Sequence, residues 1–177
     1  MSDKLHLGCG KAYLPGWLNI DLFSNIKADA YFDVTNLPYT HGSFSEIYCS
    51  HILEHVHRHA VVATLNHWRS LLKPGGILRL AVPNFETVCE HYQRFGDVEI
   101  LMGLLYGGQD NYLNRHTTTF DAKYLTKLLT QAGFSEVGFW DWRQTEQKDH
   151  DDFSRAYLPK FNEQGLHMSL NMQGVRP

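Results

Sequence analysis

The strongest restriction on the fold comes from a short apolar strand that runs directly into a glycine turn. Residues 5–7 read Leu-His-Leu, and Gly8, Cys9 and Gly10 follow at once. Glycines at a strand end let the backbone turn tightly and approach a ligand with no Cβ in the way. Taken alone, this pattern fits an ordinary tight turn as well as it fits a binding loop.

Strand and helix patterns alternate along the rest of the chain. Further strands are expected at residues 17–22, 29–34, 46–49, 77–82, 134–142 and 167–175. Helices are expected at residues 53–72, at 85–95 after the cap residue Asn84, and between the cap residue Asp121 and Gly133. This order predicts an α/β fold, a Rossmann-like three-layer sandwich with helices on both faces of the sheet. The sheet is expected to be seven-stranded and mostly parallel, with one antiparallel strand near the C-terminus.

Size and composition restrict the class of protein. With 177 residues, 43% hydrophobic and 20% charged, the chain suits a single globular domain over residues 1–177. Its net charge of −3 without a basic cluster makes a nucleic-acid partner unexpected, and no apolar run reaches the ~18 residues that membrane insertion needs. Three widely spaced cysteines and no signal-peptide pattern predict reduced thiols and a cytoplasmic location. The oligomeric state is left open.

Residues 97–119 follow neither the strand nor the helix pattern. They mix apolar residues with Gly107-Gly108 and a polar tail. An irregular insertion of this length between regular elements is often functional. We therefore expect a lid or a substrate-binding segment there.

Asp21 lies eleven residues beyond Gly10, at the end of the next expected strand. In Rossmann-like sheets an acid at this place accepts the hydroxyls of a ribose, and ligands bind beyond the carboxyl ends of the strands. Asp21 and the glycine turn therefore predict the same crevice, although a lone acid at a strand end is more often simply solvated. A dinucleotide oxidoreductase would need a third glycine where Tyr13 stands, so we set that class aside.

From here the chain resembles the class I methyltransferases that depend on S-adenosylmethionine (SAM). It is similar to the methyltransferase type 11 family and to small predicted SAM-dependent methyltransferases. Five segments carry the resemblance in the family's order: LHLGCG, NIDL, DVTNLPY, SFSEIYCSHILEHV and LLKPGGILRLAVPN. The resemblance implies SAM as the cofactor and methyl transfer to an unidentified small polar or glycan acceptor.

The resemblance also implies a set of cofactor-binding residues. The methionine part and the ribose would meet the glycine turn, and the adenine would lie against the segments after the second and third strands. Residues before the first expected helix would line the pocket near the sulfonium. The implied residues are Gly8, Cys9, Gly10, Asp21, Leu22, Asp33, Val34, Ser50 and His51.

Two departures from the family pattern concern the methionine part. The family usually has an acid two residues before its first glycine, and here that position is His6. It also usually has a helix between the glycine turn and the ribose acid, but residues 11–17 contain Pro15-Gly16 and are too short for one. Lys11 is a candidate partner for the methionine carboxylate.

Residues 51–55 read H-x-x-E-H, the inverted zinc-protease motif, and His59 continues the spacing. On one helix His51, His55 and His59 would share a face, so a zinc hydrolase is a less favoured alternative. The motif begins at a strand end, which argues against a regular helix at His51. We therefore predict no metal ligand, and we expect His57, His59 and His67 on a solvated helix face.

Methyl transfer to a hydroxyl needs a base near neutral pKa, and histidine is the usual residue. The candidates are His51, His55 and His116, although a structural hydrogen bond is an alternative for each. Other side chains that we expect to shape an acceptor site, or to be exposed for a sugar or an interface, are Asn84, Tyr106, Trp140, Trp142 and Tyr157. The second function that stays open is a catalytically inactive SAM-binding or accessory module.

Overall fold

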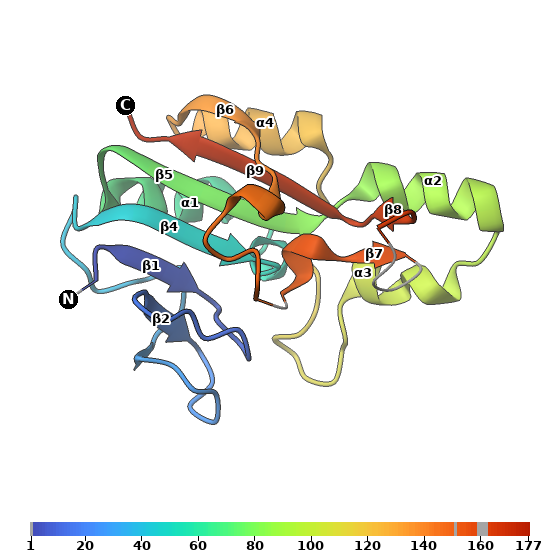
Figure 1. Ribbon diagram of the computed structural model, residues 1–177, viewed down its shortest axis with the longest axis horizontal. Coiled ribbons are helices and arrows are strands. Elements are labelled where there is room, and N and C mark those ends of the chain that lie inside the picture. Colours follow the sequence, from blue (N-terminus) through green and yellow to red (C-terminus); the bar gives the residue numbers. More distant parts are fainter. Residues whose placement is uncertain (1, 151, 159–162) are drawn as a thin grey trace.

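The computed structural model describes residues 2–150, 152–158 and 163–177. Its main sheet has seven strands in the order β3-β2-β1-β4-β5-β9-β6 (Figure 1). The strands are β1 (Lys4–Leu7), β2 (Leu18–Asp21), β3 (Ala30–Tyr31), β4 (Phe44–Ser50), β5 (Leu72–Pro83), β6 (Ser135–Phe139) and β9 (Ser169–Val175). Strand β9 runs antiparallel to its neighbours β5 and β6. The other five strands, in the sheet order β3-β2-β1-β4-β5, each pair in parallel with the next. The predicted Rossmann-like, mostly parallel sheet with one late antiparallel strand is confirmed.

The helices are α1 (Val61–Leu71), α2 (Phe85–Phe95), α3 (Met102–Tyr106) and α4 (Ala122–Gln131). Both predicted caps are confirmed: Asn84 accepts a hydrogen bond from the Glu86 N–H, and Asp121 accepts one from the Tyr124 N–H. These side chains satisfy backbone donors that the first turn of a helix leaves without partners.

The first helix is shorter than the sequence pattern predicts. It begins at Val61, and residues 53–60 hold only the single 3-10 turn η1 (Leu53–His55). The reason lies in tertiary contacts, because the Glu54 carbonyl accepts the N–H groups of Thr117 and Thr118. That carbonyl is therefore bound across the fold and does not start a regular helix.

Strand β5 begins earlier than expected, at Leu72 rather than at residue 77. Leu72 pairs with Phe44, and the register shifts between Phe44 and Glu46. The turn residues Pro74 and Gly75 therefore lie within the bounds of β5, where Gly75 has a positive φ of 75° and its N–H donates to the Arg176 carbonyl.

The two faces of the sheet are covered differently. Helices α1 and α4 lie behind the sheet in Figure 1 and enclose the main core, in which Leu65, Trp68 and Leu129 are fully buried. The opposite face has no α-helix among the described residues. Residues 141–150 and 152–157 cross it instead, against a smaller cluster that contains Tyr48 and Trp140. The third layer of the sandwich is therefore irregular chain, where the sequence led us to expect helices.

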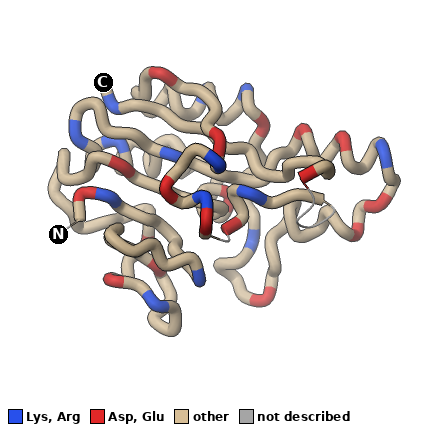
Figure 2. The backbone as a smooth tube through the Cα atoms, viewed as in Figure 1, with Lys and Arg blue, Asp and Glu red and all other residues tan. Residues whose placement is uncertain are grey.

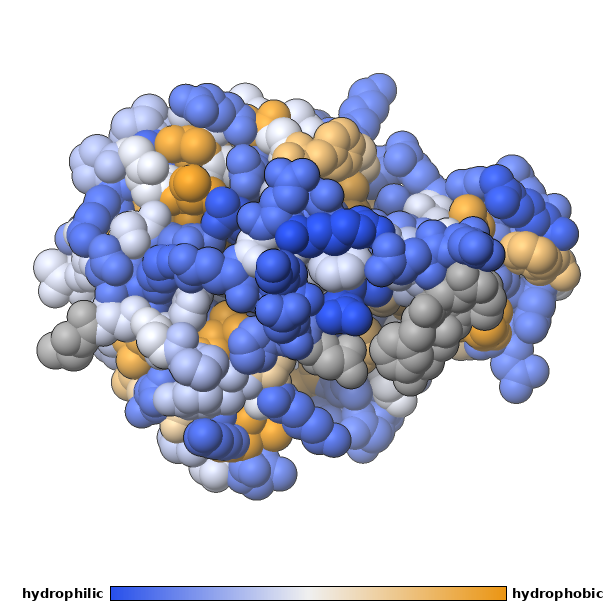
Figure 3. Space-filling view, in the orientation of Figure 1, coloured by the Kyte–Doolittle hydropathy of each residue, from blue (hydrophilic) through white to orange (hydrophobic). Residues whose placement is uncertain are grey.

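The segment that crosses this face contains short regular elements. It contains η3 (Trp142–Gln144), η4 (Phe153–Arg155) and β7 (Tyr157–Leu158), which pairs with β8 (Leu166–His167). Trp140 and Trp142, which we expected to be exposed, are only 9% and 8% exposed. The Trp140 indole donates to the Leu80 and Met172 carbonyls, so this side chain anchors the segment to the sheet. Figure 3 shows that the outer surface here is mainly hydrophilic.

Residues 97–119 hold η2 (Glu99–Leu101) and α3, and they lie at the same end of the molecule as α2 (Figure 1). Leu101 packs with Val88 of α2 and with Met168 in a third apolar cluster. No helix in the described part of the chain is long and apolar enough to cross a membrane. Figure 2 shows acidic and basic residues interspersed along the described chain.

Candidate active site

The glycine turn and the acid of β2 meet at the carboxyl edge of the sheet, as the sequence predicts. The Gly10 N–H donates to Asp21 Oδ2 at 2.9 Å, and the Phe23 N–H donates to Asp21 Oδ1 at 2.9 Å. Gly8 and Gly10 both have positive φ, at 63° and 50°. A Cβ on Gly8 would lie 2.2 Å from the Ile52 side chain, whereas a Cβ on Gly10 would meet open space. Glycine at position 8 is therefore needed for packing, and the space beside Gly10 is free.

The Asp21 carboxylate fits the task of holding a ribose. A carboxylate has about four acceptor sites. The two backbone N–H groups use one site on each oxygen, so each oxygen keeps one acceptor site. The following residues Leu22 and Phe23 are 44% exposed despite being apolar, as a surface that packs against adenine requires. The residues present thus fit an adenosine.

Asp33 and Val34 lie just beyond β3 and are less closely tied to the turn. The exposed Asp33 carboxylate accepts the N–H and the hydroxyl of Thr35 through Oδ1. The Val34 carbonyl accepts the indole N–H of Trp68 from α1. These bonds fix the loop after β3 while the second oxygen of Asp33 stays free of these contacts.

His6 and Asn19 hold the loop between the glycine turn and β2 by hydrogen bonds. No helix forms between β1 and β2, as residues 11–17 predict. Instead the Asn19 side chain accepts the Leu14 N–H and donates to the Leu14 and Trp17 carbonyls, which holds the loop in one shape. His6 Nδ1 lies 3.1 Å from Asn19 Oδ1. Burial lowers the pKa of His6 to about 4, so this histidine is a neutral structural group near pH 7.

Cys9 follows β1 in the glycine turn, and Ser50 is the last residue of β4. Burial raises the pKa of the Cys9 thiol to about 11, so it is a neutral thiol. The Ser50 hydroxyl is buried and has no hydrogen-bond partner. A buried hydroxyl without a partner is costly and points to a ligand or water that would complete it. This agrees with the expected place of Ser50 near the sulfonium.

His51 lies directly after β4, in a backbone conformation that is rare for a non-glycine residue, with φ of 53°. Its Nδ1 is 3.3 Å from Glu54 Oε1, and its Nε2 is hydrogen-bonded to Ser169 Oγ at 3.1 Å. Carboxylate, imidazole and hydroxyl therefore form a chain from β4 to β9. Strained residues held this firmly are common at functional sites.

Glu54 is the centre of a histidine cluster, and it is only 1% exposed. Its Oε1 is 3.9 Å from His116 Nε2, and the His55 and His116 rings lie 4.9 Å apart. Burial alone would raise the pKa of Glu54, but His51 and His55 outweigh it and lower that pKa. The three candidate bases His51, His55 and His116 are therefore brought together around one carboxylate.

The helical zinc face of the hydrolase alternative does not form. His51 precedes the 3-10 turn, and α1 begins at Val61, so His55 and His59 do not share a helical face. His57 and His59 are exposed, but they lie before the helix and not on it. His67 does lie on α1, yet its Nε2 accepts the Leu37 N–H, so it is not merely a solvated residue as expected.

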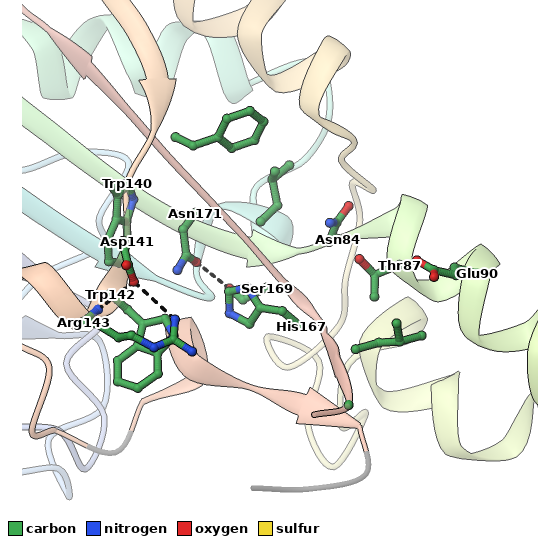
Figure 4. Close-up of a pocket in the computed structure, with 14 residues that line it drawn as sticks. Asn84, Thr87, Glu90, Trp140, Asp141, Trp142, Arg143, His167, Ser169 and Asn171 are labelled. Atoms are coloured by element: carbon green, nitrogen blue, oxygen red, sulfur yellow. Dashed lines mark hydrogen bonds and ion pairs between the residues drawn. The ribbon is translucent and has the colours of Figure 1, made fainter. Parts of the chain in front are cut away.

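A cavity of about 480 Å³ opens beside this cluster, next to the carboxyl ends of β5 and β6 and the start of β9 (Figure 4). Its wall carries polar groups of several kinds above the two buried tryptophans. Its lining includes Asn84, Thr87, Glu90, Trp140, Asp141, Trp142, Arg143, His167, Ser169 and Asn171. Ser169, which is bonded to His51, donates its hydroxyl proton to Asn171 Oδ1 in this wall. The cavity thus touches the histidine cluster through Ser169.

Sequence reasoning placed some of these residues and missed others. Asn84 lines the cavity as expected, whereas Tyr106 is exposed and Tyr157 is buried under the Arg143 side chain, which donates to its hydroxyl. Glu54 was visible as the acid of the H-x-x-E-H string but was not given a role. Ser169 had no signal, because a serine in a late strand looks like any other.

The strand order, the glycine turn after β1 and the acid ending β2 define the class I methyltransferase architecture. Residues 3–137 match the model of a family described as a methyltransferase domain. The match spans most of the chain, which therefore belongs to this family and is a SAM-dependent methyltransferase. None of the curated proteins compared matches the chain.

Solved structures share the fold at low sequence identity. A Thermotoga maritima SAM-dependent methyltransferase, described as a possible histamine N-methyltransferase, is 16% identical with a TM-score of 0.62, covering 98% of this chain and 82% of that one. A Mesorhizobium loti S-adenosylmethionine-dependent methyltransferase is 16% identical with a TM-score of 0.60, covering 98% and 90%. A Haemonchus contortus phosphoethanolamine N-methyltransferase, solved with S-adenosyl-L-methionine, is 12% identical with a TM-score of 0.56, covering 98% and 48%. At this identity the likeness concerns the fold.

Proposed function

We propose that the protein transfers the methyl group of SAM to a hydroxyl of a small polar acceptor, such as a sugar, bound in the cavity beside His51. The single observation that carries this proposal is the contact chain from Glu54 through His51 to Ser169 in the cavity wall. A cavity lined by both polar groups and aromatic rings suits a sugar-like ligand, because its hydroxyls need donors or acceptors and its ring can pack on an aromatic face.

The donor would lie across the glycine turn and the tips of β2 and β3. In this proposal Gly8, Cys9 and Gly10 meet its methionine part and ribose, and Asp21 accepts the ribose hydroxyls. The further contacts of the adenine and of the sulfonium region are assigned to Leu22, Asp33, Val34, Ser50 and His51. When bound, SAM supplies an already activated methyl group on its sulfonium.

The protein itself then has three tasks: to align the acceptor, to exclude water and to remove a proton. His51 takes the proton of the acceptor hydroxyl, and Glu54 stabilises the imidazolium that results. His55 and His116 face the same carboxylate and hold its position. Residues 97–119, which bond to the turn after β4 through Thr117 and Thr118, act as the lid or substrate segment. The three free cysteines agree with the proposed cytoplasmic location.

Calorimetry with SAM tests the donor half of the proposal. We expect micromolar binding, and Asp21→Asn should weaken it about 10- to 100-fold, since hydrogen bonds to charged groups contribute about 1.5–3 kcal/mol. Glu136→Gln on the exposed β6 edge is the matched control and should bind like the unmodified protein. An absence of SAM binding at millimolar concentration would refute the proposal.

A methyl-transfer screen over sugars and other polyhydroxylated acceptors tests the acceptor half. The expected result is turnover with an O-methylated product and S-adenosylhomocysteine. SAM binding without turnover on any acceptor of this class would instead favour the inactive, accessory module.

A further inference from the structure

Glu54, His55 and His116 also form a group whose geometry suits a metal ion, beyond the roles proposed for them in methyl transfer. Each offers one ligand atom, and the three atoms lie within 4.8 Å of one another. Two imidazoles and one carboxylate are a common ligand set of zinc and other divalent transition metals. The notable point is that the two histidines come from segments 61 residues apart, the turn after β4 and the end of the 97–119 segment.

The hydrogen bonds of the two histidines fix which ring nitrogen is free. His116 Nδ1 lies 2.9 Å from the Leu104 carbonyl oxygen, and His55 Nδ1 lies 3.1 Å from the Arg115 carbonyl oxygen. A carbonyl only accepts, so each Nδ1 carries the proton. Each neutral ring therefore presents the lone pair of Nε2. Metal-binding histidines are typically oriented in this way, by donation of the other N–H to a carbonyl or carboxylate.

The carboxylate supplies the second, independent observation. Glu54 is buried, and neither of its oxygens has a hydrogen bond of good geometry: the nearest donors or acceptors to Oε1 are His51 Nδ1 at 3.3 Å and His116 Nε2 at 3.9 Å. Oε1 thus faces the Nε2 lone pair of His116 at 3.9 Å with no hydrogen between them. Two buried acceptors opposite one another repel unless a cation lies between them.

We propose that Glu54, His55 and His116 bind one divalent transition-metal ion, with Zn²⁺ as the best fit. Tetrahedral coordination at ~2.1 Å brings ligand atoms to roughly 3.4 Å from one another, which small side-chain rotations achieve from the present distances. The three protein ligands leave a fourth position for water or another oxygen. His51 Nδ1, 3.3 Å from Glu54 Oε1, supports the carboxylate from outside the coordination sphere.

The backbone already holds the two segments together around this site. The N–H groups of Thr117 and Thr118 donate to the Glu54 carbonyl, and the Thr118 hydroxyl donates to the Val56 carbonyl at 2.9 Å. The ion would therefore bind ligands that are close to their final positions. It would also link the 97–119 segment to the turn that carries His51.

Titration of metal-free protein with ZnCl₂ by calorimetry tests the site. We expect one ion per chain, and His55→Asn and His116→Asn should each weaken binding more than about 10-fold, which is the least that loss of a mere supporting partner costs. His59→Asn is the matched control, because His59 is exposed on the same stretch and completes the rival spacing 51–55–59. Loss of binding in this control, or unchanged binding in both ligand variants, overturns the proposal.

A second measurement, the visible absorption of Co²⁺ bound to the unmodified protein, needs no variant and therefore tests the site even if a variant does not fold. Co²⁺ in a four-coordinate nitrogen–oxygen site gives visible bands, and Zn²⁺ should displace it. Protein that shows neither these bands nor zinc binding overturns the proposal. Both readouts are independent of SAM, so their failure leaves the proposed methyl transfer untouched.

Discussion

The two halves of the site are built in different ways. The proposed donor half, made of Gly8 to Gly10, Asp21 and Asp33, combines the backbone of a glycine turn with carboxylates at the tips of neighbouring strands. Its central bond joins Gly10 to Asp21, eleven residues apart. The acceptor half, made of His51, Glu54, Ser169 and the cavity, uses side chains, and its central bond joins residues 118 apart. The donor half is therefore a local design, while the acceptor half exists only in the complete fold.

The largest expected effect separates the two halves by function. His51→Asn should lower kcat by about 10²- to 10⁴-fold, the range for loss of a general base, and should weaken SAM binding far less, because His51 is only one of several residues assigned to contact SAM. Single-turnover kinetics with calorimetry measures both. A parallel loss of SAM affinity would show that His51 belongs to the donor half, and the division proposed here would be wrong.

Two glycine substitutions separate the contributions of packing and of backbone strain to the stability of the donor half. Gly8→Ala should cost about 2–5 kcal/mol of unfolding free energy, because a clash with Ile52 adds to the left-handed backbone strain. Gly10→Ala meets open space and should cost only about 1–2 kcal/mol. Denaturant unfolding measures the difference. In Gly8→Ala with Ile52→Ala the combined cost should be less than additive, and strict additivity would contradict the proposed clash.

The stability that the buried His6 gives to the loop beside the donor half should depend on pH. The folded protein holds the pKa of His6 near 4, below the ~6.5 of an unfolded chain. The free energy of unfolding is therefore highest above pH 6.5, where His6 is neutral in both states. It falls as the pH drops from 6.5 through 4, by up to about 3 kcal/mol, because the unfolded chain then binds a proton that the folded protein does not. His6→Gln should remove this part of the acid sensitivity, measured as unfolding free energy against pH. The exposed His41→Gln is the control, and identical pH profiles for His6→Gln and the unmodified protein would contradict the assignment.

The smallest effect compares two helix caps, one inside the acceptor half and one outside. Asn84→Ala and Asp121→Ala should each lose about 1 kcal/mol of stability, the usual cost of a lost cap. Because Asn84 also lines the cavity, only Asn84→Ala should raise the KM for the acceptor. Equal KM changes in both variants would show that the cavity does not bind the acceptor.

Two helices show where local sequence patterns predict helix bounds correctly and where they do not. Helix α2 was predicted at its observed bounds, because a cap residue, an apolar face and a C-terminal glycine all act within a few residues. The first helix was predicted eight residues too early. The Glu54 carbonyl, which would take part in the first turns of that helix, accepts the N–H groups of Thr117 and Thr118 instead. A local sequence pattern does not include this contact with a distant segment.

The sequence by itself determined the order of strands and helices, the glycine turn and the acid that faces it, because those features depend on neighbours in the chain. It also indicated the loop that replaces the first helix, since Pro15 and Gly16 act locally. Only the tertiary structure decided that irregular chain with buried Trp140 and Trp142 covers one face of the sheet. It alone also gathered His51, His55 and His116 around Glu54. These arrangements depend on contacts between segments about 60 residues apart, and such contacts leave no periodicity in the sequence.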